Sequence, residues 1–297
     1  MPITIVTAFF DIGRGQWNSR QGGNQPFLKR TTDTYFRRFS HLASLDNEMV
    51  VFTSPDLVDR VRRLRKGRPG AVIAVDFPRE FSALRDRIAA IQQSPEFQAR
   101  ISPDQVANPE YWSAEYVLVN LLKTTFLRRA IEGGHVHHEM AAWLDFGYCR
   151  KARTLAGVVS WDHDFDPEKI HLFSIRQWTQ PLPDRSPRAL VRHPALQHVM
   201  THNEVYVIGP SIVASRAQWL HLDALYQTVL GELMQNGWID DDQSLFLVAS
   251  LAEPEHFAIH EPTGWFEIFR QYASRSRRVG PVRAFLRRTR QHLASLL

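Results

Sequence analysis

The chain has 297 residues, of which 44% are hydrophobic and 23% are charged, and its formal net charge is +5. This composition indicates a soluble globular protein with one large domain or two small ones, and no apolar run approaches the length of a membrane span. This excess of basic over acidic residues favours anionic partners such as nucleotide phosphates, nucleic acid or an acidic membrane surface.

The single cysteine, Cys149, excludes an intramolecular disulfide and a cluster of thiolate ligands. A chain with this cysteine usage is expected in the cytoplasm. The first residues lead directly into a predicted strand and do not resemble a signal peptide.

The first predicted strand covers residues 3–10, which are β-branched and aromatic. It ends at the loop Asp11-Ile12-Gly13-Arg14-Gly15, and a glycine-containing loop after a first strand is a usual nucleotide position in α/β folds. The loop lacks the spacing of a dinucleotide fingerprint. Arg14 could pair with a diphosphate through its planar guanidinium, and a solvated loop arginine is the equal alternative.

Strands and helices then alternate, which predicts parallel βαβ units. A polar segment over residues 16–30 is expected to form a loop above the site. The further elements predicted up to residue 132 are helices at 31–45, 55–65, 81–99 and 112–132, and strands at 49–53 and 71–75.

The long predicted helix over 112–132 begins after Ser113 and is terminated by two glycines. Asn120, Lys123 and Thr124 lie on one polar face of it, within one turn of each other. Lys123 could reach a phosphate from there as a point charge, although a lysine on a helix surface is usually solvated.

Asp145 follows an apolar segment, 141–144, that is predicted to be a central strand. An acid at the carboxyl end of an inner strand projects into the crevice where open α/β sheets bind ligands, and it can hold a divalent cation or a sugar hydroxyl. Gly147 allows a backbone or a phosphate to approach closely. The alternative is a polar turn. A kinase Asp-Phe-Gly motif is disfavoured because no glycine-rich loop and no His-Arg-Asp segment precede it.

Two other clusters offer metal-ligating side chains. His135, His137 and His138 suggest zinc, but neighbouring loop histidines seldom converge on one ion. Asp162 and Asp164 form a rival metal site that resembles the start of a calcium loop, without the glycine and the closing glutamate that an EF-hand requires.

The remaining pattern predicts strands at 170–175, 205–208 and 257–260, and helices at 215–236 and 244–251. Asp240, Asp241 and Asp242 precede the last helix. Asp240 is expected to cap it, and like charges so close together raise at least one pKa, which suits a base or a metal ligand. The final strand ends at His260, a second candidate metal ligand.

Residues 281–297 predict a basic amphipathic helix with Phe285 and Leu286 on its apolar face and Arg287 and Arg288 on its polar face. It would dock either on an anionic membrane or on the protein's own core. The sequence therefore divides into a domain over residues 1–270 and a tail over residues 271–297.

Three motifs together resemble a known family. They are Ile-Thr-Ile-Val-Thr-Ala-Phe-Phe-Asp-Ile-Gly-Arg-Gly with Trp17, Trp-Leu-Asp-Phe-Gly-Tyr around Asp145, and Asp-Asp-Gln before a helix. The combination resembles the HtrL/YibB-like bacterial family, grouped with WlaTC-type glycosyltransferases, over residues 3–270. The resemblance implies a GT-A-like α/β fold, in which a Rossmann-type mixed sheet is flanked by helices.

Enzymes of the GT-A type place a metal-binding Asp-x-Asp after the central strand. Asp145 matches its first position, and Gly147 stands where the second acid would be. The residue patterns and the resemblance together assign donor binding to Ala8, Phe9, Arg14, Asn120, Lys123, Asp145 and Gly147, Mn²⁺ or Mg²⁺ to Asp145 and His260, and catalysis to Asp241 or Asp242.

The leading hypothesis is a glycosyltransferase that moves a sugar from a nucleotide-sugar donor to a cell-envelope glycan at the inner face of the inner membrane. The cation, or Arg14 and Lys123 in its place, would stabilise the departing diphosphate. One acid of residues 240–242 would deprotonate the acceptor if the reaction inverts. The alternatives are a catalytically inactive scaffold and a nucleic-acid-binding protein, although no nucleic-acid motif is present and nucleic acid is not expected as a partner.

Overall fold

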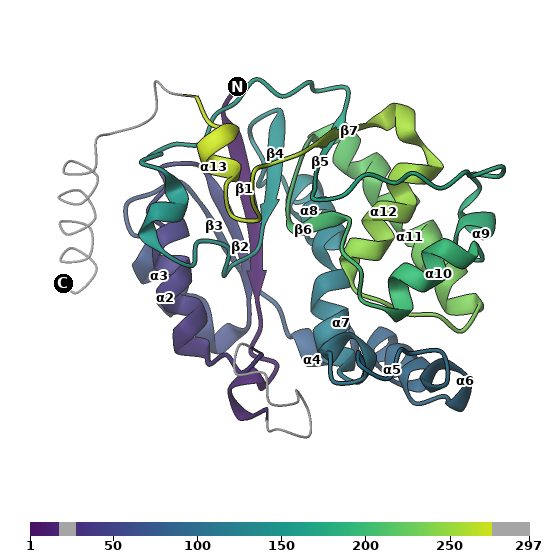
Figure 1. The fold of residues 1–297 in the computed structure, drawn as a ribbon. Helices are drawn as coiled ribbons and strands as arrows, with labels where there is room; N and C mark the ends of the chain where they lie inside the picture. Colours follow the sequence, from purple (N-terminus) through teal and green to yellow (C-terminus); the bar gives the residue numbers. More distant parts are fainter. Residues whose placement is uncertain (18–27, 275–297) are drawn as a thin grey trace.

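The computed structural model describes residues 1–17 and 28–274. These residues form a seven-stranded sheet in the order β3-β2-β1-β4-β6-β5-β7, with helices on both faces (Figure 1). The predicted α/β fold class, a Rossmann-type mixed sheet flanked by helices, is confirmed.

Strands β1, β2, β3 and β4 form the parallel half of the sheet. β1 and β2 are buried along their whole length, as expected for near-continuous apolar strands covered on both faces. The strands are β1 (Ile3–Phe9), β2 (Met49–Thr53), β3 (Gly70–Ala74), β4 (Met140–Leu144), β5 (Ile170–Ser174), β6 (Val207–Ser215) and β7 (Phe257–His260).

Strand β6 is longer than the strand predicted there. The strand predicted to stop before Gly209 instead continues to Ser215, and it runs antiparallel to both β4 and β5. Its pairing with β5 is irregular between Ile212 and Val207. Pro210, which has no N–H to donate, therefore lies where the ladder is interrupted. Its carbonyl accepts a hydrogen bond from the Asp145 N–H at 3.0 Å, which links β6 to the end of β4.

The two faces of the sheet carry separate hydrophobic cores, because alternate side chains of a strand point in opposite directions. Val6 and Ala8 of β1 belong to one core, and Ile3 and Ile5 to the other. The first core is covered by α5 (Ser82–Gln92), α7 (Ala114–Leu121), α8 (Lys123–Glu132), α11 (Arg216–Gln235) and α12 (Asp242–Ala252), and the second by α2 (Thr32–Leu42), α3 (Val58–Arg65) and α13 (Ile268–Gln271).

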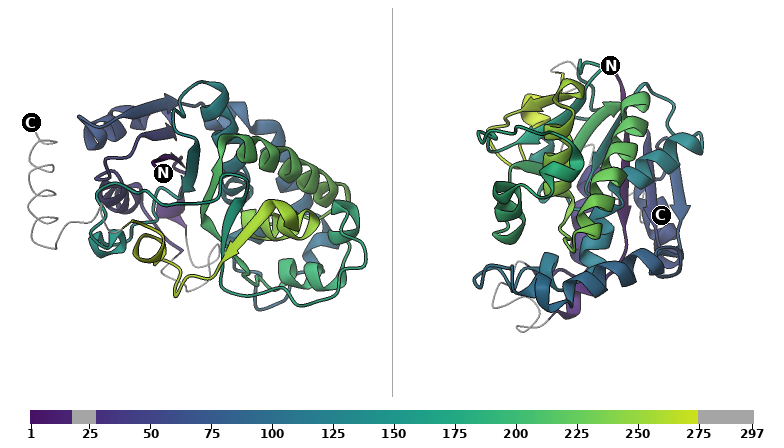
Figure 2. Two further views of the ribbon diagram at one scale, coloured as in Figure 1. Left: turned by 90° about the horizontal axis from the view of Figure 1, so that it is seen from above. Right: turned by 90° about the vertical axis from the view of Figure 1, so that its right-hand side faces the viewer.

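Short helices complete the fold. Figures 1 and 2 both show α4–α6 at the end of the sheet toward which β1 runs. The short elements are α4 (Phe77–Glu80), α6 (Pro95–Gln98), α9 (Pro187–Leu190), α10 (Pro194–Thr201), and the 3-10 helices η1 (Arg14–Gln16), η2 (Pro55–Leu57), η3 (Pro109–Tyr111), η4 (Ala152–Leu155) and η5 (Pro254–His256).

The helix predicted over 112–132 is in fact two helices. Ser113 caps α7 as predicted, with its hydroxyl oxygen accepting the Tyr116 N–H at 3.2 Å. Leu122, with φ −84° and ψ 3°, separates α7 from α8. Lys123 is therefore the first residue of a new helix, and its side chain is buried and not solvated.

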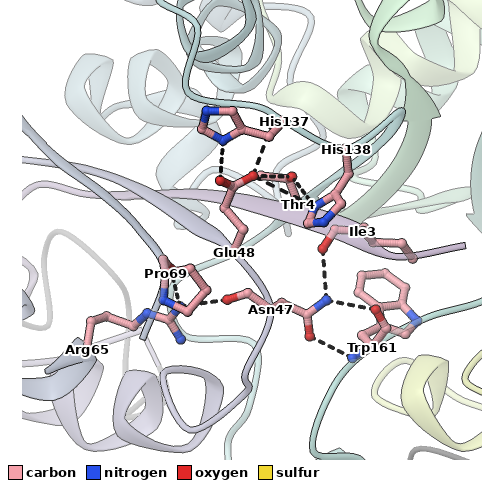
Figure 3. Close-up of polar contacts among 9 residues, drawn as sticks. All are labelled: Ile3, Thr4, Asn47, Glu48, Arg65, Pro69, His137, His138 and Trp161. Carbon is pink, nitrogen blue, oxygen red and sulfur yellow. Dashed lines mark hydrogen bonds and ion pairs between the residues drawn. The ribbon is translucent and has the colours of Figure 1, made fainter. Parts of the chain in front are cut away.

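A polar network holds the amino ends of β1, β2 and β4 together (Figure 3). The Glu48 carboxylate accepts hydrogen bonds from the Thr4 hydroxyl at 2.7 Å and from the His137 N–H at 3.1 Å, and it also contacts the His137 ring. His138 Nδ1 lies 2.9 Å from the same hydroxyl. Two of the three histidines considered for zinc are thus bonded into this network.

Asn47, next to Glu48, joins the network to the segment before β5 (Figure 3). Its amide donates to the carbonyls of Ile3 at 2.8 Å and Trp161 at 2.7 Å, and its oxygen accepts from the Trp161 N–H at 2.6 Å. The buried Arg65 donates to the Asn47 carbonyl at 2.7 Å. Burial lowers the pKa of Arg65 to about 9.

The packed chain continues to the last described residue. Trp161 Nε1 donates to the Tyr272 carbonyl at 2.6 Å, and the Ser274 N–H donates to the Asp162 carbonyl at 2.9 Å. Packing therefore continues past the predicted domain boundary at residue 270.

The predicted tail helix over 281–297, and most of the predicted loop over 16–30, lie outside the described residues. Within residues 1–17 and 28–274, no helix is both long and apolar enough to cross a membrane.

We predict that Glu48→Gln lowers the free energy of unfolding by about 1–3 kcal/mol at pH 7, because the amide loses the charge-assisted bonds to Thr4 and His137. These bonds lower the pKa of Glu48 in the folded state against the opposing effect of burial. The contribution is therefore complete above the pKa of the unfolded chain and is lost as the pH falls through the lower folded pKa.

Urea unfolding at pH 7 and at pH values descending below 4.5 measures this difference, with the exposed Glu168→Gln as control. A difference between the wild type and Glu48→Gln that does not shrink toward low pH would contradict the assignment.

Candidate functional site

A pocket opens at the carboxyl ends of β1 and β4. From β1 the chain passes to β2 and β3 on one side, whereas β4 lies on the other side of β1. This reversal of strand order is the switch point at which open α/β sheets bind ligands. The pocket is completed by α2, the α7–α8 junction, the start of α12 and the segment after β7.

Nine of the ten sequence-predicted site residues line this pocket. The exception is His260. The nine come from both sides of the switch point and from three helix ends. The nine are Ala8, Phe9, Arg14, Asn120, Lys123, Asp145, Gly147, Asp241 and Asp242.

Lys123 lies at the centre of the acidic side of the pocket. Its ammonium group contacts Asp242 Oδ2 at 2.7 Å, Asp145 Oδ1 at 3.1 Å and the Gly209 carbonyl at 3.2 Å. An ammonium group has three N–H donors, so all three are occupied by the protein. Burial by itself lowers the pKa of Lys123, but Asp145 and Asp242 outweigh that effect and raise it, so the side chain is charged.

Asp145 is the exposed member of this group. Its side chain is 34% exposed, whereas those of Lys123 and Asp242 are 3% and 2% exposed. Asp145 Oδ1 also accepts from Trp143 Nε1 at 2.8 Å. Both protein contacts are made by the same oxygen, which leaves Oδ2 able to accept from a ligand.

The three acids before α12 have different partners. Asp241, and not Asp240 as predicted, is the N-cap, and its carboxylate accepts the N–H of Gln243 at 3.0 Å and the Gln243 side-chain amide at 3.1 Å. Asp240 accepts from the Ser244 hydroxyl instead. The sequence could not separate neighbouring acids because the choice of cap depends on the φ and ψ angles of a single residue.

Burial raises the pKa of each of these acids. The pKa of Asp241 rises to about 6, with a contribution from the nearby Glu110, and that of Asp242 to about 7 despite the opposing effect of Lys123. The pKa of Asp240 is raised by burial and by Asp241. Glu110, which the sequence analysis did not select, has its pKa raised by burial to about 7.

Gln243 adds a polar group that is unsatisfied in the protein. Its Nε2 donates to Asp241, which fixes the orientation of the amide, and its buried Oε1 has no hydrogen-bond partner among the described residues. A buried acceptor in this state favours a ligand that donates a hydrogen bond, as a hydroxyl does.

Arg14 mainly holds the loop after β1 in place. Its guanidinium donates to the Leu28 carbonyl at 3.1 and 3.2 Å and to the Tyr35 hydroxyl at 2.8 Å. It also stacks over Trp17 and Tyr116. Because these contacts engage much of the guanidinium, Arg14 is less available to a diphosphate than its sequence position suggested.

Gly147 permits a close approach, but the groups that come close are the side chains of Tyr35 and Arg38 and not a ligand. A Cβ atom at this position would lie 3.1 Å from the Tyr35 ring and 3.7 Å from Arg38 Cδ. An aspartate at this second position of an Asp-x-Asp motif would pack tightly against Tyr35 and would require the ring to shift by a few tenths of an ångström. Asn120 bonds to the Tyr116 carbonyl of its own helix at 3.0 Å.

The pocket is also lined by three arginines that were not predicted as site residues: Arg30, Arg38 and Arg150. Arg38 lies on α2, Arg30 just before that helix, and Arg150 after β4, where it stacks on Phe266 at 4.4 Å. No motif joins these positions, and only the packing of α2 beside the end of β4 brings them together.

His260 is not part of the pocket, so the predicted pairing of Asp145 and His260 around one cation is wrong. His260 Nε2 lies 2.8 Å from His171 Nδ1 on the neighbouring strand β5, among Phe165, Phe173 and Tyr272. Burial and the neighbouring His171 lower the pKa of His260 to about 4. The prediction that His260 ends a strand placed it at the correct edge of the sheet, but strands β6 and β5 lie between β4, which carries Asp145 at its end, and β7.

The residues present do not fit a divalent cation between Asp145 and Asp242, because the ammonium group of Lys123 already contacts both carboxylates. The rival acid Asp162 pairs with Pro2, at the amino end of β1 and therefore at the opposite edge. Among the described residues, the group of three side chains arranged to share a metal ion is His221, Glu253 and His256, and none of them lines the pocket.

Comparisons with known proteins agree with the sequence motifs. The profile of a family described as a bacterial protein of unknown function (HtrL_YibB) matches residues 1–274. The chain is 39% identical to Protein HtrL of Escherichia coli (strain K12) over 289 residues, which covers 96% of this chain and 98% of that protein. Among solved structures, mouse xyloside xylosyltransferase 1 in its apo form matches with a TM-score of 0.40 and 11% identity, over 93% of this chain and 96% of that one.

We predict that Lys123→Met lowers the free energy of unfolding by about 3–5 kcal/mol, because it leaves Asp242 buried without a compensating charge. The double variant Lys123→Met/Asp242→Asn should lose less than the sum of the two single variants, since it leaves no unpaired charge behind. Urea unfolding of the four proteins in this cycle measures the coupling. Strictly additive losses would show that the ammonium and the carboxylate do not interact.

Proposed function

The chain belongs to the HtrL/YibB family, and we propose that it is a glycosyltransferase that transfers a sugar from a nucleotide-sugar donor to a cell-envelope glycan. The observation that supports this most directly is the composition of the pocket at the switch point. It combines buried acids of raised pKa, an unsatisfied hydrogen-bond acceptor and the arginines Arg30, Arg38 and Arg150. These groups suit a base, a sugar hydroxyl and a diphosphate respectively.

In the proposed reaction, an acceptor hydroxyl attacks the anomeric carbon of the donor sugar. The bond between that carbon and the terminal phosphate oxygen breaks, and the nucleoside diphosphate leaves with the electron pair. In an inverting reaction the hydroxyl proton passes to a carboxylate of the protein, whereas a retaining reaction needs no such base.

Of the two candidate bases, Asp241 suits this role better than Asp242. Asp242 bonds to the ammonium of Lys123 at 2.7 Å, so a proton on it would weaken a buried ion pair. Asp241 accepts bonds only from the neutral groups of Gln243, and its pKa of about 6 leaves it ionised at neutral pH. Asp242 would instead position Lys123.

Asp145 would bind the donor. Oδ1 is held by Trp143 and Lys123, and the partly exposed carboxylate offers Oδ2 to a ribose or sugar hydroxyl. Mn²⁺ or Mg²⁺, which the family resemblance implies, would have to bind here without displacing Lys123. Since that ammonium occupies the space between the carboxylates, no step above depends on a cation.

The donor assignment predicts that nucleotide sugars raise the thermal unfolding temperature of the protein and nucleosides do not. A panel of nucleotide sugars that differ in base and sugar, with and without Mn²⁺, identifies the donor. Asp145→Asn should weaken binding of that donor by about ten-fold or more, because a charged acceptor is lost. If no nucleotide sugar shifts the unfolding temperature of the wild type, the proposed function is wrong and a non-catalytic role must be considered.

The catalytic assignment predicts that Asp241→Asn lowers kcat by about 10²- to 10⁴-fold with little change in donor affinity. Because the base must be ionised, wild-type kcat should fall as the pH drops below about 6, the pKa of Asp241. Asp242→Asn is the matched comparison, since it should disturb Lys123 and donor binding as well. Equal kcat in Asp241→Asn and the wild type would assign the base elsewhere or indicate retention.

A further inference from the structure

Of the four arginines that line the pocket, Arg30, Arg38 and Arg150 lie just before α2, on α2 and after β4, respectively. The Arg30 N–H donates to the Arg14 carbonyl at 3.3 Å, which ties it to the loop after β1. Arg38 Cδ lies 3.7 Å from the Cβ position of Gly147, two residues from Asp145. Arg150 follows the same turn and rests on the Phe266 ring.

Two members of this cluster, Arg38 and Arg150, carry positive charge that the described acids do not pair with. Within residues 1–17 and 28–274, neither Arg38 nor Arg150 forms an ion pair. Burial and the charges of Arg30 and Arg150 lower the pKa of Arg38 to about 10, and burial and Arg30 lower that of Arg150. Bringing such cations together costs free energy that the folded chain alone does not recover.

Lys123, which also lines the pocket, cannot take the role of this cluster. All three donors of Lys123 are used by Asp145, Asp242 and Gly209. Its charge offsets that of the two carboxylates, so a phosphate approaching the acidic side would meet no excess of positive charge. An anionic group is favoured on the arginine side instead, where planar guanidinium forks match phosphate oxygens.

We infer that Arg30, Arg38 and Arg150 form the binding site for the diphosphate group of the donor and hold it without a divalent cation. The chemical class of the ligand is a pyrophosphate ester. The arginine side and the acidic side of the pocket then have different tasks, because the first neutralises the leaving group and the second contacts the sugar and the acceptor.

This inference rests on the proposed function only for the identity of the ligand as a donor. The anion site itself can be tested with inorganic pyrophosphate, which has no nucleoside or sugar. Isothermal titration of the full-length protein with pyrophosphate in excess EDTA should show binding. Arg38→Gln and Arg150→Gln should each weaken that binding by about ten-fold or more, the effect expected for a lost charge-assisted contact.

Arg63→Gln is the matched control. Arg63 is an exposed arginine on α3 and does not line the pocket. The control removes the same charge from the protein and should leave pyrophosphate affinity unchanged. Equal weakening in all three variants would show only a response to net charge and would overturn the site.

Thermal unfolding without ligand separates a binding role from a structural one. If these arginines exist to bind an anion, Arg38→Gln relieves repulsion and should be at least as stable as the wild type. An arginine that mainly supports the fold would instead lower the unfolding temperature when replaced. Arg38→Lys keeps the charge but loses the fork, so its affinity should fall between those of the wild type and Arg38→Gln.

A competition titration assigns the site to the donor. A nucleoside diphosphate in EDTA should displace pyrophosphate, whereas simultaneous binding of both would place the arginines on an acidic acceptor and overturn the assignment. If nucleotide sugars bind only with Mn²⁺ and pyrophosphate does not bind in EDTA, this inference fails and the proposed function stands. If pyrophosphate binds through the arginines but no nucleotide sugar does, the anion site stands and the proposed function fails.

Discussion

The contact of Lys123 with Asp145 and Asp242 is the interaction on which the site depends. It joins the start of α8 to the end of β4 and to the start of α12, across 119 residues of chain in the case of Asp242. Lys123 and Asp242 are removed from water here, which is stabilising only while each retains its partners. Gly209 on β6 makes this possible, since a Cβ atom there would lie 2.2 Å from Asp242 Oδ2. The position of the acids is therefore set by the fold and not by a ligand.

An internal cation changes how the charge of the pocket is distributed. A lysine between two carboxylates neutralises much of their charge, so the acidic side attracts a metal ion less than two free acids would. Positive charge that no acid offsets gathers instead around Arg38 and Arg150. The pocket is thus divided between an acidic side whose carboxylates contact Lys123 and a basic side on which Arg38 and Arg150 form no ion pair among the described residues. This division favours a ligand with one anionic and one hydroxyl-rich end.

Regular apolar and polar patterns in the sequence predicted the fold well. They could not predict contacts between residues that are far apart in the chain. The bounds of β2 and β7 and the position of Asp145 follow from apolar runs ending at polar residues. The direction of β6 does not, because strand direction depends on pairing partners and not on local sequence. Lys123 was placed on a polar helix face, yet its partners arrive from β4 and α12. Arg38 carried no signal, since no motif links it to Arg30 and Arg150 is far away in the chain.

The two ends of the parallel strands illustrate opposite uses of buried charge. At the amino ends, Glu48, Asn47 and Arg65 have their hydrogen bonds supplied by the protein, so this edge is stable without a ligand. At the carboxyl ends, burial and neighbouring arginines lower the pKa of Arg38 and Arg150, and neither forms an ion pair within the described part of the chain. Any anion that binds there recovers free energy that folding left unrecovered. Ligand-induced stabilisation should accordingly concentrate at this edge, which makes thermal stability a sensitive readout for the natural ligand.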